Sequence, residues 1–253
     1  MHEVEQEAAR VLEPQLRDHL VLTTTAFNLV GPLLSRAASG PLESLPRSLQ
    51  VAIKLLLRLA NDLRCVQILS IRGYPLQAAI LVASLYEVAF TIAFVGRDDD
   101  LAQAWLDHDD PTTPFRDAWT LTRAVIVELG IPEPDAQTRK FYRVYRQLCL
   151  AKHANPLLES RLGAELRGDV VMHSNGPDTS ENAIRVAWFT LQNATGLALI
   201  ALENFLRSHL NHCSAEDLSA LVDALEAIGI ERERLAAAAV ARWGNEDPFI
   251  GRW

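Results

Sequence analysis

Hydrophobic residues recur every three or four positions along this chain, and that spacing predicts helices. The clearest segment is 76–95, LQAAILVASLYEVAFTIAFV, which is too long for a strand and apolar on almost every side. Gly73 and Pro75 precede it and Gly96 follows it, and these residues are typical of helix boundaries. A helix that is hydrophobic all round is buried. We therefore expect 76–95 to form the central helix of the protein.

The few polar residues of this helix fall on one side of a helical wheel: Gln77, Ser84, Glu87 and Thr91. Burying a carboxylate is costly unless it has a partner, so Glu87 should meet a side chain from another helix. Arg58 and Arg64 on the preceding helix are candidates, because a tight Gly-Tyr-Pro turn makes the two helices antiparallel neighbours. With Tyr145, these side chains make up the expected buried polar network.

The remaining segments have the same helical periodicity. We expect helices at 3–13, 15–38, 47–72, 98–107, 114–129, 135–152, 179–210, 214–228 and 231–243. Pro14 should interrupt the first pair, and Asp178 with Glu181 resembles a capping box. Segment 153–178 is irregular, with room for one short helix, and no segment alternates with the period of a strand.

The expected fold is therefore all-α, a multi-helix bundle of about seven to nine helices around 76–95. We divide it into an N-terminal helical segment (1–46), a core bundle (47–211) and a C-terminal helical pair with a tail (212–253).

The charge and cysteine content of the chain limit the kinds of partner and the compartment that we expect. The 253 residues carry a net charge of −8, so no overall basic field attracts nucleic acid or anionic lipid, and we expect no sequence-specific DNA binding. A local basic site remains compatible with this charge. Cys65, Cys149 and Cys213 lie far apart and form neither a disulfide framework nor a zinc-binding pair. A reducing compartment fits this cysteine usage, and we expect a cytoplasmic protein.

Segment 76–95 is also long enough to cross a bilayer. Glu87 in its middle argues against that, since a charge inside lipid costs several kcal/mol. Arg97 on one flank is followed at once by three aspartates, and the acidic N-terminus lacks the apolar region of a secretory signal. We therefore expect a buried core helix and no membrane.

Helix 135–152 carries the best candidate chemistry. Tyr142, Arg146, Cys149 and His153 form a stripe along its edge. Arg146 and His153 are two helical turns apart, about 10 Å along the axis. An arginine that holds a phosphate and a histidine that moves a proton are what RNA cleavage through the 2′-hydroxyl requires. A structural interpretation is also open, in which His153 caps the helix and Arg146 pairs with Glu87.

The run Arg146-Gln-Leu-Cys-Leu-Ala-Lys-His153 resembles the Arg-x(4–6)-His signature of the HEPN (higher eukaryotes and prokaryotes nucleotide-binding) superfamily. That resemblance implies an all-α, usually dimeric, metal-independent endoribonuclease of toxin or phage-defence systems. Arg146 would neutralise phosphate, His153 would act as general acid or base, and Tyr142 or Asn155 would position it. Gln147 departs from the family, which often has Asn, Asp or His directly after the arginine.

A broader run, from Val51 to about Ala201, is similar to a bacterial all-α family of unknown function. The shared features are a long helix, a turn with glycine, an apolar helix with a central Glu, and a Tyr-x(n)-His helix end followed by proline. In this chain they are Glu87, Tyr145, His153 and Pro156. The arginine that this family often has one turn before the Glu is Ala83 here. The resemblance implies no established activity.

Other chemistry has little support. His209 and His212 could share a metal at the end of a helix, but histidines there also complement the helix dipole. Nucleotide-binding glycine loops and nucleophile elbows are missing, so we expect no metal and no cofactor.

Two hypotheses remain: a HEPN-like ribonuclease acting on RNA as a homodimer, and a non-catalytic interaction or regulatory module. An open groove lined by Arg146 and His153 would favour the first, and burial of both against Glu87 would favour the second.

Overall fold

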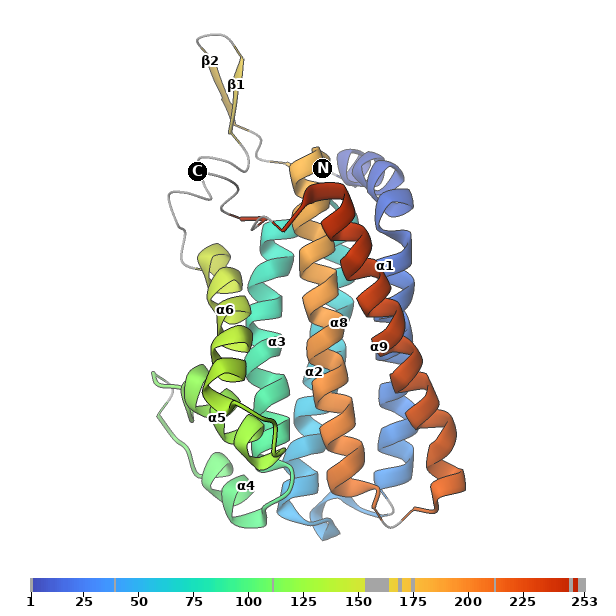
Figure 1. Cartoon of the computed structure of the whole chain (residues 1–253), viewed down its shortest axis with the longest axis vertical. Helices are drawn as coiled ribbons and strands as arrows, with labels where there is room; N and C mark the ends of the chain where they lie inside the picture. The colour runs from blue at the N-terminus through green and yellow to red at the C-terminus, as the bar shows by residue number, and fades with distance from the viewer. Residues whose placement is uncertain are drawn as a thin grey trace.

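The computed structural model describes residues 2–38, 40–110, 112–152, 164–167, 170–173, 176–211, 213–245 and 248–249. These residues hold eight α-helices, most of which stand side by side as an upright bundle (Figure 1). This confirms the all-α fold class. The helices are α1 (His2–Ala37), α2 (Arg47–Ile71), α3 (Pro75–Val95), α4 (Asp99–Leu106), α5 (Ala118–Glu128), α6 (Pro134–Lys152), α8 (Glu181–His209) and α9 (Ala215–Trp243), with a 3₁₀ turn at Leu42–Ser44.

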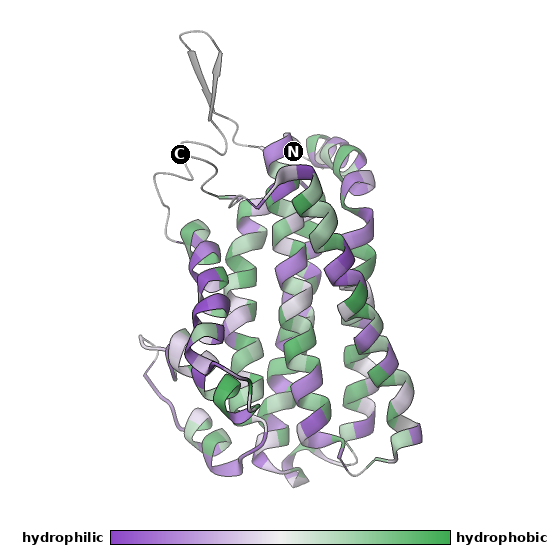
Figure 2. Cartoon of the chain, in the orientation of Figure 1, coloured by the Kyte–Doolittle hydropathy of each residue, from purple (hydrophilic) through white to green (hydrophobic). Residues whose placement is uncertain are grey.

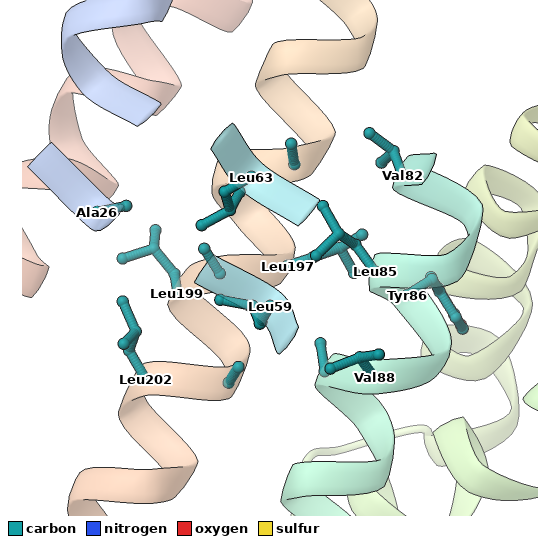
Figure 3. Packing of buried hydrophobic residues seen from close by; sticks show 14 of the residues in the cluster. Ala26, Leu59, Leu63, Val82, Leu85, Tyr86, Val88, Leu197, Leu199 and Leu202 are labelled. Carbon is teal, nitrogen blue, oxygen red and sulfur yellow. The ribbon is translucent and has the colours of Figure 1, made fainter. Parts of the chain in front are cut away.

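Helix α3 is the centre of the bundle, as its sequence predicts. It packs against α2 and α8 along its length, and α4, α5 and α6 cover another side (Figure 1). Figure 3 shows leucines of α2 and α8 meeting Val82, Leu85 and Val88 of α3. Burial of this apolar surface is the main force that holds the bundle together.

One hydrophobic core runs through all three predicted segments of the chain. Leu12 from the first, Phe205 from the second and Leu235 from the third belong to the same cluster of buried residues. The proposed boundaries fall in the connections between helices, near residues 46 and 211. The segments therefore pack on a shared core.

The turn between α2 and α3 depends on a glycine. Gly73 has φ of +83°, a left-handed conformation that side chains disfavour. The Tyr74 N–H donates to the Leu69 carbonyl at 2.9 Å, which closes the end of α2. A Cβ atom on Gly73 would lie 2.7 Å from Cβ of Pro177. The turn makes α2 and α3 antiparallel neighbours, as predicted.

Two predicted helix interruptions are wrong. Helix α1 continues through Pro14, and α9 continues through Gly229. Leu12 and Leu16 are both fully buried, so the inward face of α1 remains packed on either side of the proline. The inward face of α9 likewise continues beyond Gly229 to Leu235. Tertiary packing thus overrides the weak local preference to break the helix.

Two predicted helix starts also need correction. Helix α5 begins four residues later than expected, where the Asp117 side chain accepts from the Thr120 N–H at 2.9 Å. The cap of α8 is Ser180, whose hydroxyl accepts from the Ala183 N–H at 3.2 Å. Asp178 instead accepts from the Ser180 N–H at 2.8 Å, so the predicted capping box does not form. Aspartate and serine both serve as caps, and spacing alone does not choose between them.

Part of the segment 153–178, which was expected to be irregular, forms short strands. Two four-residue strands, β1 (Ala164–Arg167) and β2 (Val170–His173), pair in an antiparallel manner. Strands this short give too few positions for an alternating pattern to be recognised. The short helix predicted after Asn155 and Pro156 falls on residues that begin outside the described part of the chain, since 153–163 are not described.

Among the described helices, α3 alone is long and apolar enough to cross a bilayer. In its most apolar window, 72% is buried inside the protein. This extent of burial agrees with the position of α3 at the centre of the helical bundle.

Candidate functional site

A cleft of about 350 Å³ lies between α2, α3, α5 and α6, and the polar side of α3 forms one of its walls. Ser84, Glu87 and Thr91 line it, so three of the four predicted polar residues share one site. Gln77 is exposed outside the cleft. The other side chains that carry polar or aromatic groups into it are Arg58, Trp105, Phe115, Arg116, Asp117, Tyr142 and Tyr145.

Glu87 forms a hydrogen bond with a side chain from another helix, as its partly buried position predicts. The Tyr145 hydroxyl, on α6, donates to Glu87 Oε1 at 2.7 Å. The Tyr145 ring also packs against Tyr86 of α3, with ring centroids 4.9 Å apart. Burial, together with the neighbouring Glu87 carboxylate, raises the pKa of the Tyr145 hydroxyl well above its usual range. The hydroxyl therefore remains protonated and able to donate.

The arginines expected to pair with Glu87 do not do so. Arg58 donates to Ser84 Oγ at 2.8 Å, one turn before Glu87, and its Nε lies 3.7 Å from Asp62 Oδ2. Arg64 is exposed and donates to Gln67 Oε1 at 3.4 Å. Six residues on a helix correspond to a rotation of about 600°, so positions 58 and 64 face directions about 120° apart. Arg58 belongs to the cleft and Arg64 does not.

The two predicted catalytic residues of α6 that the structure describes, Tyr142 and Arg146, do not lie in the same site. Tyr142 lines the cleft, and its ring packs edge-on against Trp119 at 5.4 Å. Arg146 is exposed, lies outside the cleft and forms no hydrogen bond or ion pair with a described residue. The structure therefore does not bring Arg146 to Glu87. His153 and Asn155 lie outside the described residues.

Helix α6 also carries an exposed basic row that the sequence reasoning missed. Arg139, Arg143 and Arg146 follow one another at helical spacing, and Lys140 lies beside them. All four are exposed, and none forms an ion pair with a described residue. Figure 2 shows several strongly hydrophilic turns along α6. The sequence indicates this row by the spacing of its arginines, which are four residues and then three residues apart in a protein whose net charge is −8. We call these four residues the basic face of α6.

The described residues contain no group of three His, Cys, Asp or Glu side chains that could hold a metal ion. His209 instead packs on Phe205, with ring centroids 5.1 Å apart, and burial lowers its pKa to about 4. Its candidate partner His212 lies outside the described residues.

Comparison with protein-family models, curated proteins and solved structures finds no match to this chain.

Tyr145→Phe tests the contact that joins α6 to α3. We expect the free energy of unfolding to fall by about 1–3 kcal/mol, because the half-buried Glu87 carboxylate loses its donor. Tyr142→Phe is the matched control, since the Tyr142 hydroxyl has no hydrogen bond to a described residue. Urea denaturation should show a change below about 0.5 kcal/mol for the control. Equal effects of the two variants would mean that the Glu87 contact contributes no specific stability.

Proposed function

We propose that this protein is a HEPN-like, metal-independent endoribonuclease that contacts RNA through the basic face of α6. The observation that supports this most is the exposed row Arg139, Arg143 and Arg146, which has no acidic partner among the described residues. Unpaired arginines in a row provide phosphate contacts along a nucleic-acid strand. They supply local positive charge on a chain whose net charge is −8.

The proposed chemistry needs only side chains. Arg146 neutralises the scissile phosphate, and His153 takes the proton from the ribose 2′-hydroxyl or gives one to the leaving oxygen. The 2′-oxygen attacks phosphorus, the bond to the 5′-oxygen breaks, and a 2′,3′-cyclic phosphate forms. Tyr142 or Asn155 would position the histidine. A homodimer would bring two α6 helices together. The HEPN resemblance implies a toxin or phage-defence role, and the cysteine usage favours the cytoplasm.

A second candidate is a non-catalytic interaction or regulatory module. The observation that favours it is the hydrogen bond between Glu87 and Tyr145, which uses the central carboxylate to hold α6 on α3. A satisfied polar contact of this kind specifies how helices dock. In this account Glu87 and Tyr145 define the core, and α6 presents its outer surface to a protein partner.

RNA binding by the basic face is the first test. We expect wild-type protein to bind a fluorescein-labelled single-stranded RNA with an affinity that falls steeply as salt rises, because phosphate contacts release counterions. Arg139→Ala should lower the slope of log K against log salt by about 0.7, the value for one phosphate contact on a single strand. Fluorescence anisotropy at several salt concentrations measures this slope.

Arg64→Ala is the matched control, because Arg64 is an exposed arginine on α2. Its affinity and slope should equal those of the wild type. RNA binding that is absent, or that Arg139→Ala and Arg64→Ala change equally, would contradict the proposed RNA surface.

A further inference from the structure

A second and larger cleft, of about 570 Å³, lies beside α8 and takes lining residues from α6 and α9. Three arginines line it, Arg143, Arg185 and Arg232, and none of its described lining residues is acidic. The whole chain has 32 acidic and 24 basic residues, so this concentration of positive charge is unusual for the protein. A concave site with convergent cations attracts an anionic ligand.

Arg232 gives the strongest indication that the cleft is built for an anion. Its Nε donates to the Gln192 carbonyl at 3.0 Å, yet its half-buried guanidinium forms no ion pair with a described residue. Burial lowers the pKa of this group, and the nearby Glu233 carboxylate raises it by a smaller amount. A Cβ atom on Gly196 would lie 2.8 Å from the guanidinium, so the glycine leaves it space. A buried charge of this kind is costly without a negative partner.

Two further polar atoms of residues that line this cleft have no hydrogen-bond partner among the described residues. His19, from α1, is only 2% exposed and lines the cleft, and one of the two atoms is its Nε2. The other is Gln192 Oε1, which is buried as well. Burial lowers the pKa of His19 to about 4, so the ring is neutral at pH 7. Both atoms are available to hydrogen-bond a ligand that also meets the arginines.

Aromatic and amide groups complete the lining. Trp188 packs against His19, with ring centroids 4.5 Å apart, and Phe189 and Trp243 add further ring surface. The amide side chains of Gln147, Gln192 and Asn193 offer donors and acceptors. Guanidinium groups bind phosphate, and aromatic and amide groups bind a flat heterocycle.

We propose that this cleft binds a nucleotide, with its phosphate on Arg143, Arg185 and Arg232 and its base beside Trp188 and Phe189. The volume lies in the range of small-molecule sites. The ligand is a free nucleotide or the terminal nucleotide of an RNA strand, which share this chemistry. The proposal does not require ribonuclease activity, because it rests on a different group of residues from Arg146 and His153.

Calorimetric titration of the full chain with AMP tests the site. We expect binding to the wild type and at least a tenfold loss of affinity in Arg232→Met. The melting temperature of Arg232→Met should be unchanged or higher, because the variant removes an unpaired half-buried charge. Arg143→Ala provides a second variant at an exposed position, and it should weaken AMP binding while leaving stability intact. Arg207→Met, an exposed arginine on α8 outside this cleft, is the control and should bind AMP like the wild type.

Several results would overturn the proposal. Failure of AMP to bind the folded wild type is one such result. Equal AMP affinities in the wild type, Arg232→Met and Arg143→Ala are another. Inorganic phosphate that binds as tightly as AMP would overturn the assignment to a nucleotide. Competition by a 5′-phosphorylated oligoadenylate would assign the site to an RNA end, and its failure would assign it to free nucleotide. Because AMP is not an RNA chain, a lack of RNA cleavage leaves this measurement unaffected.

Discussion

Phe90→Ala is expected to lower the free energy of unfolding by about 3–5 kcal/mol, as large-to-small substitutions of buried aromatic residues do. Phe90 lies in the second half of α3 and is 2% exposed. Its ring packs against Tyr86 at 4.6 Å and Phe141 of α6 at 5.9 Å. Because helices pack around α3 on several sides, they cannot all move inward to fill the cavity. Urea denaturation followed by circular dichroism measures the change.

Ile230→Ala is the control for this measurement. Ile230 is 67% exposed on α9, so its truncation leaves no internal cavity. We expect its effect to remain within about 0.5 kcal/mol. If Phe90→Ala cost less than about 1 kcal/mol, α3 would not be the tightly packed centre of the bundle.

The central helix and its polar side could be predicted because both depend on local spacing. A run of apolar residues longer than a strand becomes a buried helix wherever its neighbours lie. The helical repeat likewise places Ser84, Glu87 and Thr91 on one side, and the structure brings all three into one cleft. The need of Glu87 for a partner was visible in the sequence for the same reason.

The identity of that partner was not visible, because it depends on how α6 is docked. Arg58 reaches Ser84 instead of Glu87, and the Tyr145 hydroxyl takes the place that charge alone would give to an arginine. Such a choice follows from the rotation and height of two helices, which their separate sequences do not determine.

The second cleft was still harder to predict from the sequence, because it too depends on how separate helices are docked. His19, Arg143 and Arg232 come from three helices far apart in the chain, and no motif joins them. A sequence also cannot show that an arginine is half-buried without an acidic partner. Arg143 belongs both to the basic face of α6 and to this cleft, so the two proposed sites adjoin.

RNA cleavage is the other large expected effect. With a labelled single-stranded RNA in EDTA at low salt, His153→Ala is expected to reduce the single-turnover rate by about 10²–10⁴, the usual contribution of a general acid or base. Arg146→Ala should reduce it by about 10²–10³, since a donor to the developing phosphate charge is lost. Arg64→Ala serves as the control with an unchanged rate, and circular dichroism should show the same helix content in all variants.

This cleavage assay decides between a ribonuclease and an interaction module. We expect wild type and Arg64→Ala to cleave RNA without a metal ion and to leave 2′,3′-cyclic phosphate ends, and we expect the His153 and Arg146 variants to lose this cleavage. No cleavage by any of them, together with a lower melting temperature for His153→Ala, would contradict it. His153 would then be a structural residue, and the protein an interaction module built on the contact between Glu87 and Tyr145.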